Sequence, residues 1–232
     1  MPVGSRLVIR LRKPLERKWV KRGGRIADLP RRLPPAARKA EIESSARATE
    51  KLGALPLAEA YGQPGATRKP KQVRAASWQG DLYAYLVDWH DPRIVVEFGS
   101  AFGVSGMYLS SALRQGWMYS FEINPSWADV AERNIKSVTD RYTLTRGAFE
   151  DHVGDIPDSI DLALVDGIHT HDFVTRQWQI LQPRMAPGAL VLFDDIDFNR
   201  GMGEAWRDIC ADPQVVGAVE VSKRLGLVEL AL

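Results

Sequence analysis

Two acidic clusters, each directly after an apolar run, constrain the fold of this chain more than any other feature. Asp166-Gly167-Ile168-His169 follows the run 162–165, and Asp194-Asp195 follows the run 189–193. The residues between them have a helical pattern that a Pro-Gly turn closes. A strand, a crossover helix and a second strand form a parallel unit, so both strands end at the same edge of the sheet. Open α/β sheets bind ligands at that edge, and we expect three carboxylates and a histidine to meet there.

A glycine-containing turn follows another buried-type strand upstream. Residues 93–99 form the apolar strand, and Ser100 to Gly103 lead into a helical pattern that begins at Val104. Glycines at such a turn let the backbone bend tightly and approach a ligand closely. A second strand ends at Glu122, and an acidic residue about that far beyond a glycine turn suits the two hydroxyls of a nucleoside ribose. The combination predicts a nucleotide-type binding site.

The remaining pattern supplies the other elements of a sheet. A leading helix is expected from about Ala76, and Asn124-Pro125 is a typical helix start. Strands at 215–221 and 225–230 are joined by three residues, too few for a crossover, so they must pair antiparallel at one sheet edge. The sequence therefore predicts an α/β fold: a Rossmann-like, doubly wound sheet with five parallel strands, a C-terminal antiparallel hairpin and a basic N-terminal extension.

Charge divides the chain into two parts. Residues 1–75 carry 19 Lys+Arg against 6 Asp+Glu, whereas residues 76–232 carry 12 against 23. The first part is rich in turns and has one helical stretch, from Pro35 to Leu52, so we expect residues 1–75 to be a partly helical arm. Residues 76–232 are expected to form the catalytic domain. Such an arm either docks on the acidic domain, its own or that of a homodimer partner, or grips nucleic acid.

Composition indicates the cellular compartment and limits the kinds of partner. A single cysteine, Cys210, excludes an intrachain disulfide framework and suits a reducing compartment, so a cytoplasmic location is expected. No apolar stretch approaches the ~18 residues that span a membrane, so no membrane partner is expected. The arm offers few aromatic residues for stacking bases, which disfavours nucleic acid as a partner without excluding it.

Three motifs in combination resemble those of a known enzyme family. They are Glu97-Phe98-Gly99 through Gly103, Asp166-Gly167-Ile168-His169, and Pro187-Gly188 through Asp194-Asp195. The chain resembles a class I S-adenosylmethionine-dependent methyltransferase over about residues 90–230, and is most similar to the O-methyltransferases of small molecules and natural products. Ala101 stands where many class I members have a glycine.

The resemblance implies S-adenosylmethionine as cofactor and a role for individual residues. The glycine turn would approach the amino-acid and ribose parts, Glu97 would face the amino group, Glu122 would take the ribose hydroxyls, and Ala148 and Phe149 would lie beside the adenine. The residues expected to bind the cofactor are Glu97, Gly99, Ser100, Gly103, Glu122, Gly147, Ala148, Phe149 and Asp166.

The resemblance also implies a chemistry. Asp166, Asp194 and Asp195 would hold Mg²⁺, which prefers oxygen ligands. Asp166 and His169 are the expected catalytic residues, with His169 as the general base that takes a proton from the acceptor hydroxyl. The acceptor would be a small molecule such as a sugar, a phenol or a natural product. Two alternatives remain: an RNA methyltransferase that uses the basic arm to grip nucleic acid, and a non-catalytic scaffold that binds the cofactor.

Overall fold

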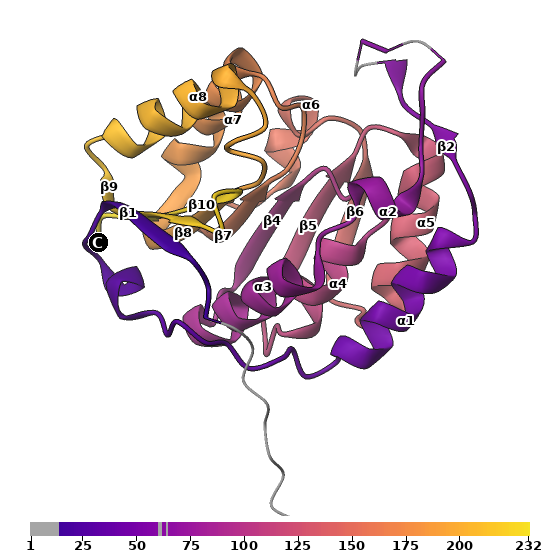
Figure 1. Ribbon diagram of the computed structural model, residues 1–232, viewed down its shortest axis with the longest axis horizontal. Helices are drawn as coiled ribbons and strands as arrows, with labels where there is room; N and C mark the ends of the chain where they lie inside the picture. The colour runs from indigo at the N-terminus through magenta and orange to yellow at the C-terminus, as the bar shows by residue number, and fades with distance from the viewer. Residues whose placement is uncertain (1–13, 60–61, 64) are drawn as a thin grey trace, which may run out of the picture.

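The computed structural model describes residues 14–59, 62–63 and 65–232, and its centre is an eight-stranded sheet (Figure 1). Five neighbouring strands are parallel, in the order β6-β5-β4-β7-β8, and β10, β9 and β1 continue the sheet antiparallel. Their bounds are β1 (Arg17–Lys21), β4 (Ile94–Phe98), β5 (Trp117–Glu122), β6 (Tyr142–Arg146), β7 (Ile160–Val165), β8 (Met185–Phe193), β9 (Val215–Val221) and β10 (Leu225–Leu230). The predicted α/β architecture, with its five parallel strands and C-terminal hairpin, is confirmed.

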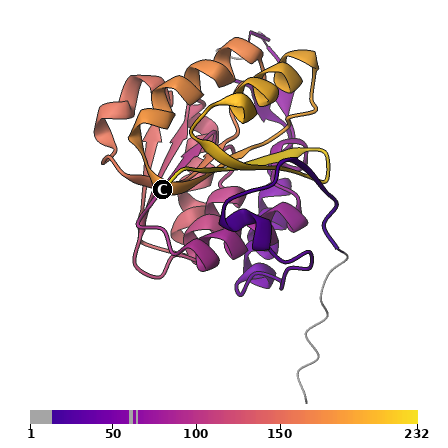
Figure 2. The same ribbon diagram turned by 90° about the vertical axis from the view of Figure 1, so that its left-hand side faces the viewer.

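Helices cover both faces of this sheet (Figure 2). One layer contains α1 (Lys39–Glu50), α3 (Ser77–His90), α4 (Val104–Ser111) and α5 (Pro125–Lys136), and the other contains α6 (Phe149–His152), α7 (His171–Leu181) and α8 (Arg200–Ala211). Shorter elements are α2 (Pro70–Val73), the two-stranded pair β2 (Leu55–Pro56) and β3 (Thr67–Arg68), and the 3-10 turns η1 (Arg25–Asp28), η3 (Val153–Asp155) and η4 (Gln182–Arg184).

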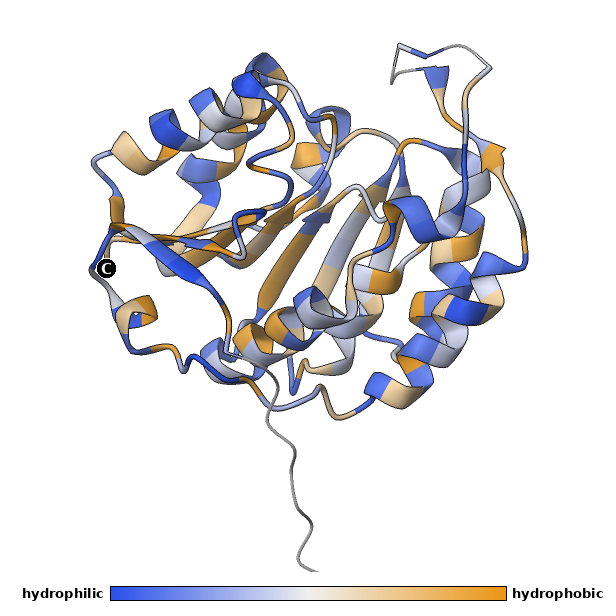
Figure 3. Cartoon of the chain, in the orientation of Figure 1, coloured by the Kyte–Doolittle hydropathy of each residue, from blue (hydrophilic) through white to orange (hydrophobic). Residues whose placement is uncertain are grey.

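The core consists of two large apolar clusters, one on each face of the sheet. The central strands are largely hydrophobic along their length, whereas α1 and the other outer helices present many hydrophilic residues (Figure 3). This distribution is expected of parallel strands that are buried on both faces. Each crossover helix covers the sheet with one apolar stripe and exposes its polar side.

Strand register fixes the position of the predicted site. Phe98 of β4 is level with Phe121 of β5 and Val165 of β7, and Val165 is level with Phe193 of β8. The residues that follow these four strand positions therefore lie side by side at the carboxyl edge of the sheet. They are Gly99, Glu122, Asp166 and Asp194.

The N-terminal arm is integrated into the sheet more closely than the sequence predicted. Strand β1 pairs antiparallel with β9, so the hairpin is not the edge of the sheet. Ile26, Ile42 and Ala46 of the arm are fully buried in the same apolar cluster as α3 and α4. The described part of the arm therefore docks on its own chain, one of the two arrangements that its charge allowed.

Two local features were not predicted from the sequence pattern. The Pro187-Gly188 pair, expected as a turn before a strand, lies inside β8, where the β7–β8 pairing shifts register and Gly188 has a φ of 71°. Helix α8 begins at Arg200, because the Asn199 side chain caps it by accepting the Met202 N–H at 2.9 Å. In the described part of the chain, no helix has the length and apolar character needed to cross a membrane.

Candidate active site

The turn after β4 is built around one glycine that no other residue can replace. Gly99 has a φ of 80°, and a Cβ at this position would lie 2.0 Å from the Asp166 carbonyl oxygen. The close packing of these two strand ends brings the glycine turn and the Asp166 loop together. Gly103 also has a positive φ, but a Cβ there would meet the backbone of Ala131 on α5, so Gly103 serves helix packing.

Glu122 is held at the end of β5 by the backbone of the glycine turn. Its side chain is buried, and its two oxygens accept the N–H groups of Ala101 at 2.7 Å and Asn124 at 2.8 Å. Burial raises the pKa of Glu122 to about 7, although the backbone hydrogen bonds work in the opposite direction. Each carboxylate oxygen has a second lone pair, which leaves acceptor sites for the two hydroxyls of a ribose.

Two adjoining cavities share Glu122 and open along the carboxyl edge of the sheet. The larger has a volume of about 420 Å³, within the range of small-molecule sites. The smaller extends toward the loop after β6 and shares Gly99, Glu122, Gly167 and Ile168 with the larger. The two together form a groove across the ends of β6, β5, β4 and β7.

The small cavity, with a volume of about 30 Å³, has an aromatic wall. It is lined by Gly147, Ala148 and Phe149, which the resemblance assigns to the cofactor. The Phe149 ring is buried and packs edge-on against Phe98, with ring centroids 4.0 Å apart. Phe149 therefore belongs to the core and to the wall of the cavity at once.

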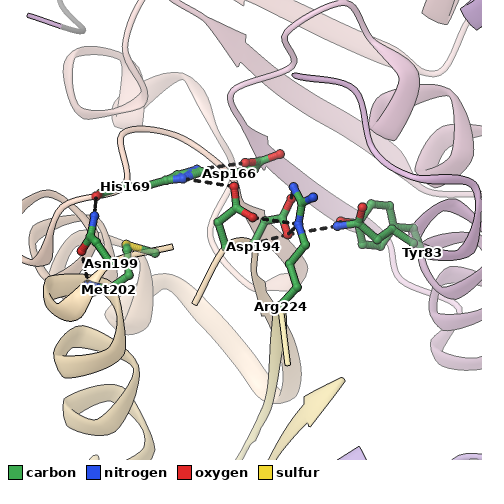
Figure 4. A network of polar contacts seen from close by, with 9 residues as sticks. Tyr83, Asp166, His169, Asp194, Asn199, Met202 and Arg224 are labelled. Atoms are coloured by element: carbon green, nitrogen blue, oxygen red, sulfur yellow. Dashed lines mark hydrogen bonds and ion pairs between the residues drawn. The ribbon is translucent and has the colours of Figure 1, made fainter. Parts of the chain in front are cut away.

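His169 lies between two carboxylates at the far end of the large cavity. Its Nε2 is 3.4 Å from Asp166 Oδ1, and its Nδ1 is 3.6 Å from Asp195 Oδ2 (Figure 4). All three side chains line the cavity. Asn199 donates its side-chain amide to the His169 carbonyl oxygen at 2.9 Å, which holds the loop that carries the imidazole.

The three titratable groups are tuned toward their neutral forms. Burial lowers the pKa of His169, although Asp194 opposes this effect. Burial and the nearby Asp194 and Asp195 raise the pKa of Asp166, and burial together with Asp194 raises the pKa of Asp195 to about 6. A neutral imidazole at neutral pH can accept a proton, and Asp195, with a pKa of about 6, is ionised at that pH and would stabilise the imidazolium that results.

Asp194 has a different environment from its neighbour. Its side chain is only 2% exposed, and Arg224 binds it with two hydrogen bonds, from Nε to Oδ1 and from Nη2 to Oδ2, both 3.0 Å long. Gln79 Nε2 and the Asp195 N–H also donate to Oδ1. Asp194 does not line the cavity.

The residues expected to bind the cofactor therefore fall into two groups. The groove is lined by Gly99, Glu122, Gly147, Ala148, Phe149 and Asp166. It is not lined by Glu97, Ser100 or Gly103. Glu97 and Ser100 are buried and contact Ser120 on β5, and burial raises the pKa of Glu97.

Several residues of the cavity were not singled out from the sequence. The arm supplies Leu57, Gln63, Arg68, Gln72 and Val73, and the loops after β8 and β9 supply Phe198, Asn199 and Arg224. Nothing in the sequence of the arm places it over the site. Arg224 lies in the short turn of the predicted hairpin, but the pattern of that turn does not show that its side chain reaches the cavity.

The predicted Mg²⁺ site can be tested against this arrangement. Mg²⁺ requires oxygen ligands at about 2.0–2.1 Å in a near-octahedral shell. The Arg224 guanidinium already lies between Asp194 and Asp195, with its Nε 2.7 Å from Asp195 Oδ1. Within the described residues, no group of three or more His, Cys, Asp or Glu side chains is arranged to hold a metal. The three aspartates together do not fit a shared Mg²⁺ ion, and that expectation stays a prediction.

Part of the sequence matches a known family of domains. Residues 96–196 match the family described as "Methyltransferase domain". The sequence matches none of the curated proteins.

Solved structures share the fold. The O-methyltransferase TomG of Streptomyces achromogenes, involved in tomaymycin synthesis and solved with SAM, has a TM-score of 0.63 at 15% identity, over 86% of this chain and 92% of that one. Cofactor-bound Rv0187 from MTB has a TM-score of 0.63 at 18% identity, over 82% and 88%. The O-methyltransferase of Bacillus cereus, in complex with SAH, has a TM-score of 0.60 at 17% identity, over 80% and 90%. The chain thus shares the fold of these methyltransferases, and residues 96–196 are similar to a methyltransferase domain.

Proposed function

We propose that this methyltransferase-domain protein is an S-adenosylmethionine-dependent O-methyltransferase that acts on a hydroxyl of a small molecule. The observation that carries the proposal is the position of His169. Its neutral imidazole lines the same cavity as Glu122 and Gly99, and two carboxylates flank it. A binding scaffold without activity would have no use for this arrangement.

The residues along the groove support an order for the parts of the cofactor. The wall at Ala148 and Phe149 suits the adenine, and Glu122 suits the ribose hydroxyls. The methionine part would then lie in the large cavity, toward Asp166 and His169. The cofactor, when bound, supplies an electrophilic methyl group on a sulfonium sulfur.

In the proposed mechanism the protein's own groups activate and position the acceptor. His169 takes the proton of the acceptor hydroxyl as the oxygen attacks the methyl carbon and the carbon–sulfur bond breaks. Asp195 stabilises the imidazolium through its negative charge, since its carboxylate lies 3.6 Å from Nδ1, and Asp166 lies 3.4 Å from Nε2. Holding the two reactants in line provides much of the acceleration. Magnesium, implied by the resemblance, takes no part in this mechanism, because Arg224 already binds Asp194 and Asp195.

The arm gives the acceptor end of the cavity its size and polarity. Leu57 and Val73 contribute apolar surface, and Gln63, Arg68 and Gln72 contribute polar groups. A cavity of about 420 Å³ that must also hold part of the cofactor favours a small acceptor over an RNA strand. The structure of the arm therefore supports substrate covering as its role.

The decisive experiment supplies the protein with methyl-labelled S-adenosylmethionine and, separately, with a small-metabolite extract and with total RNA. Label should enter a compound of the extract at a hydroxyl, as its mass and fragmentation would show. Label that enters only RNA, with salt-dependent RNA binding, would support the RNA methyltransferase alternative instead. No transfer to either, together with intact cofactor binding, would favour the scaffold.

A further inference from the structure

The carboxylate cluster of the active site contains its own cation. Arg224 comes from the turn between β9 and β10 and reaches across the end of β8 (Figure 4). Its Nε lies 3.0 Å from Asp194 Oδ1 and 2.7 Å from Asp195 Oδ1. One guanidinium therefore bridges the two consecutive aspartates that the sequence assigned to a metal.

The arrangement around Asp194 leaves this carboxylate closed to the cavity. Arg224 donates to both of its oxygens, and Gln79 also donates to Oδ1 at 3.0 Å. The orientation of Gln79 is fixed, because its Oε1 accepts the Ala76 N–H at 2.8 Å. A bidentate arginine–carboxylate pair with a further buried donor is among the stronger polar arrangements in proteins. A divalent ion bound to the same oxygens would have to displace Arg224.

Asp195 connects this pair to the base. Arg224 contacts one of its oxygens, and His169 Nδ1 lies 3.6 Å from the other. Asp195 has a φ of 54°, a left-handed conformation that turns its side chain toward the cavity while Asp194 stays beneath it. Arg224, itself 41% exposed, also lines the cavity. Guanidinium, carboxylate and imidazole therefore form a chain that ends in the groove.

We propose that Arg224 is a positioning residue that replaces the divalent cation, neutralising Asp194 and Asp195 and holding Asp195 against His169, so that methyl transfer needs no metal. The inference rests on the proposed function for the role of His169. The geometry of Arg224 and the two aspartates can be tested without turnover. Removing the guanidinium should convert the cluster into the metal site that the sequence suggested.

The test is a titration of the full-length protein with Mn²⁺, followed by the paramagnetic resonance signal of the free ion, after treatment with chelator and its removal. The wild-type protein should show no stoichiometric Mn²⁺ site in the aspartate cluster. Arg224→Ala should bind Mn²⁺ at least about tenfold more tightly than the wild type, a change of the size that neighbouring groups impose on metal sites. Adding Asp195→Asn to that variant should abolish the gain. Arg224→Lys should retain a cation and resemble the wild type.

Arg114→Ala is the matched control, because Arg114 also contacts two aspartates, Asp88 and Asp91, and none of the three lines the groove. It should leave Mn²⁺ binding unchanged. A wild-type protein that binds one Mn²⁺ and loses it with Asp195→Asn would overturn the proposal, even if Arg224→Ala failed to fold. SAH binding, measured on the same samples, separates the two claims: its absence in the wild type would contradict the proposed function but not the metal result.

Discussion

Glu122 offers the sharpest test of cofactor binding, because its role predicts both an affinity and a pH dependence. Replacing Glu122 with Ala removes the acceptors proposed for both ribose hydroxyls. Hydrogen bonds to a charged group contribute about 1.5–3 kcal/mol. The dissociation constant of SAH should therefore rise by about 10- to 150-fold at pH 8.

The pH dependence follows from the raised pKa of Glu122. With a pKa of about 7 in the free protein, the carboxylate is mostly ionised at pH 8 and mostly protonated at pH 6. A protonated carboxyl loses acceptor capacity, so SAH should bind about tenfold more weakly at pH 6 than at pH 8, since one pKa unit corresponds to about 1.4 kcal/mol. Glu122→Gln, which cannot ionise, should bind weakly at both pH values and lose the dependence.

Isothermal calorimetry with SAH at pH 6 and pH 8 measures both the effect of Glu122→Ala and the pH dependence of the affinity. Glu132→Ala is the control, because Glu132 is an exposed acid that pairs with Arg146 away from the groove. It should bind SAH like the wild type. If Glu122→Ala retained full affinity, or if the wild type bound equally well at pH 6 and pH 8, the assignment of the ribose to Glu122 would be refuted.

Two further variants test the base and the turn. His169→Ala should lower turnover by about 10²–10⁴-fold and leave SAH affinity nearly unchanged, whereas His152→Ala, beside Asp155 outside the large cavity, should remain active. Equal turnover of the two histidine variants would contradict the role of His169. Gly99→Ala should lose SAH binding and lower the unfolding temperature, because its Cβ would lie 2.0 Å from the Asp166 carbonyl oxygen. Gly53 has a φ of 76°, and an added Cβ would have nothing within 4 Å, so Gly53→Ala should lower the unfolding temperature only slightly. A similar fall in unfolding temperature in the Gly99 and Gly53 variants would argue against the close packing of Gly99 on Asp166.

The parallel core could be predicted because its pattern is local. Strand ends at Glu122 and Val165, the Asn124 cap and the two hairpin strands all follow from hydrophobic runs and the residues that end them. The sequence also placed Gly99, Asp166 and His169 at one edge, because parallel strands with crossover helices leave no other arrangement. Local signals were sufficient wherever the fold repeats a strand–helix unit.

The arm could not be predicted in the same way. Its short strand β1 pairs with β9, which is about 200 residues away, and the strand is mostly polar and charged. Such a strand has no apolar alternation that would reveal its partner. Its role in covering the cavity depends on that long-range docking.

The difference between Asp194 and Asp195 was also beyond the sequence. The two are identical in type and adjacent, but the backbone at Asp195 adopts a left-handed conformation, and only Asp195 lines the cavity. The register of β10 against β8, which brings Arg224 beside them, is set by the packing of the whole hairpin. Only tertiary structure separates a pair of metal ligands from an ion pair.

The most direct measurement of the central claim is a crystal structure of the protein with SAH. The account predicts adenine beside Ala148 and Phe149, both ribose hydroxyls on Glu122, and the sulfur in the large cavity with open space between it and His169. SAH bound elsewhere, or in this groove with its sulfur pointing away from His169, would contradict the proposed methyl transfer.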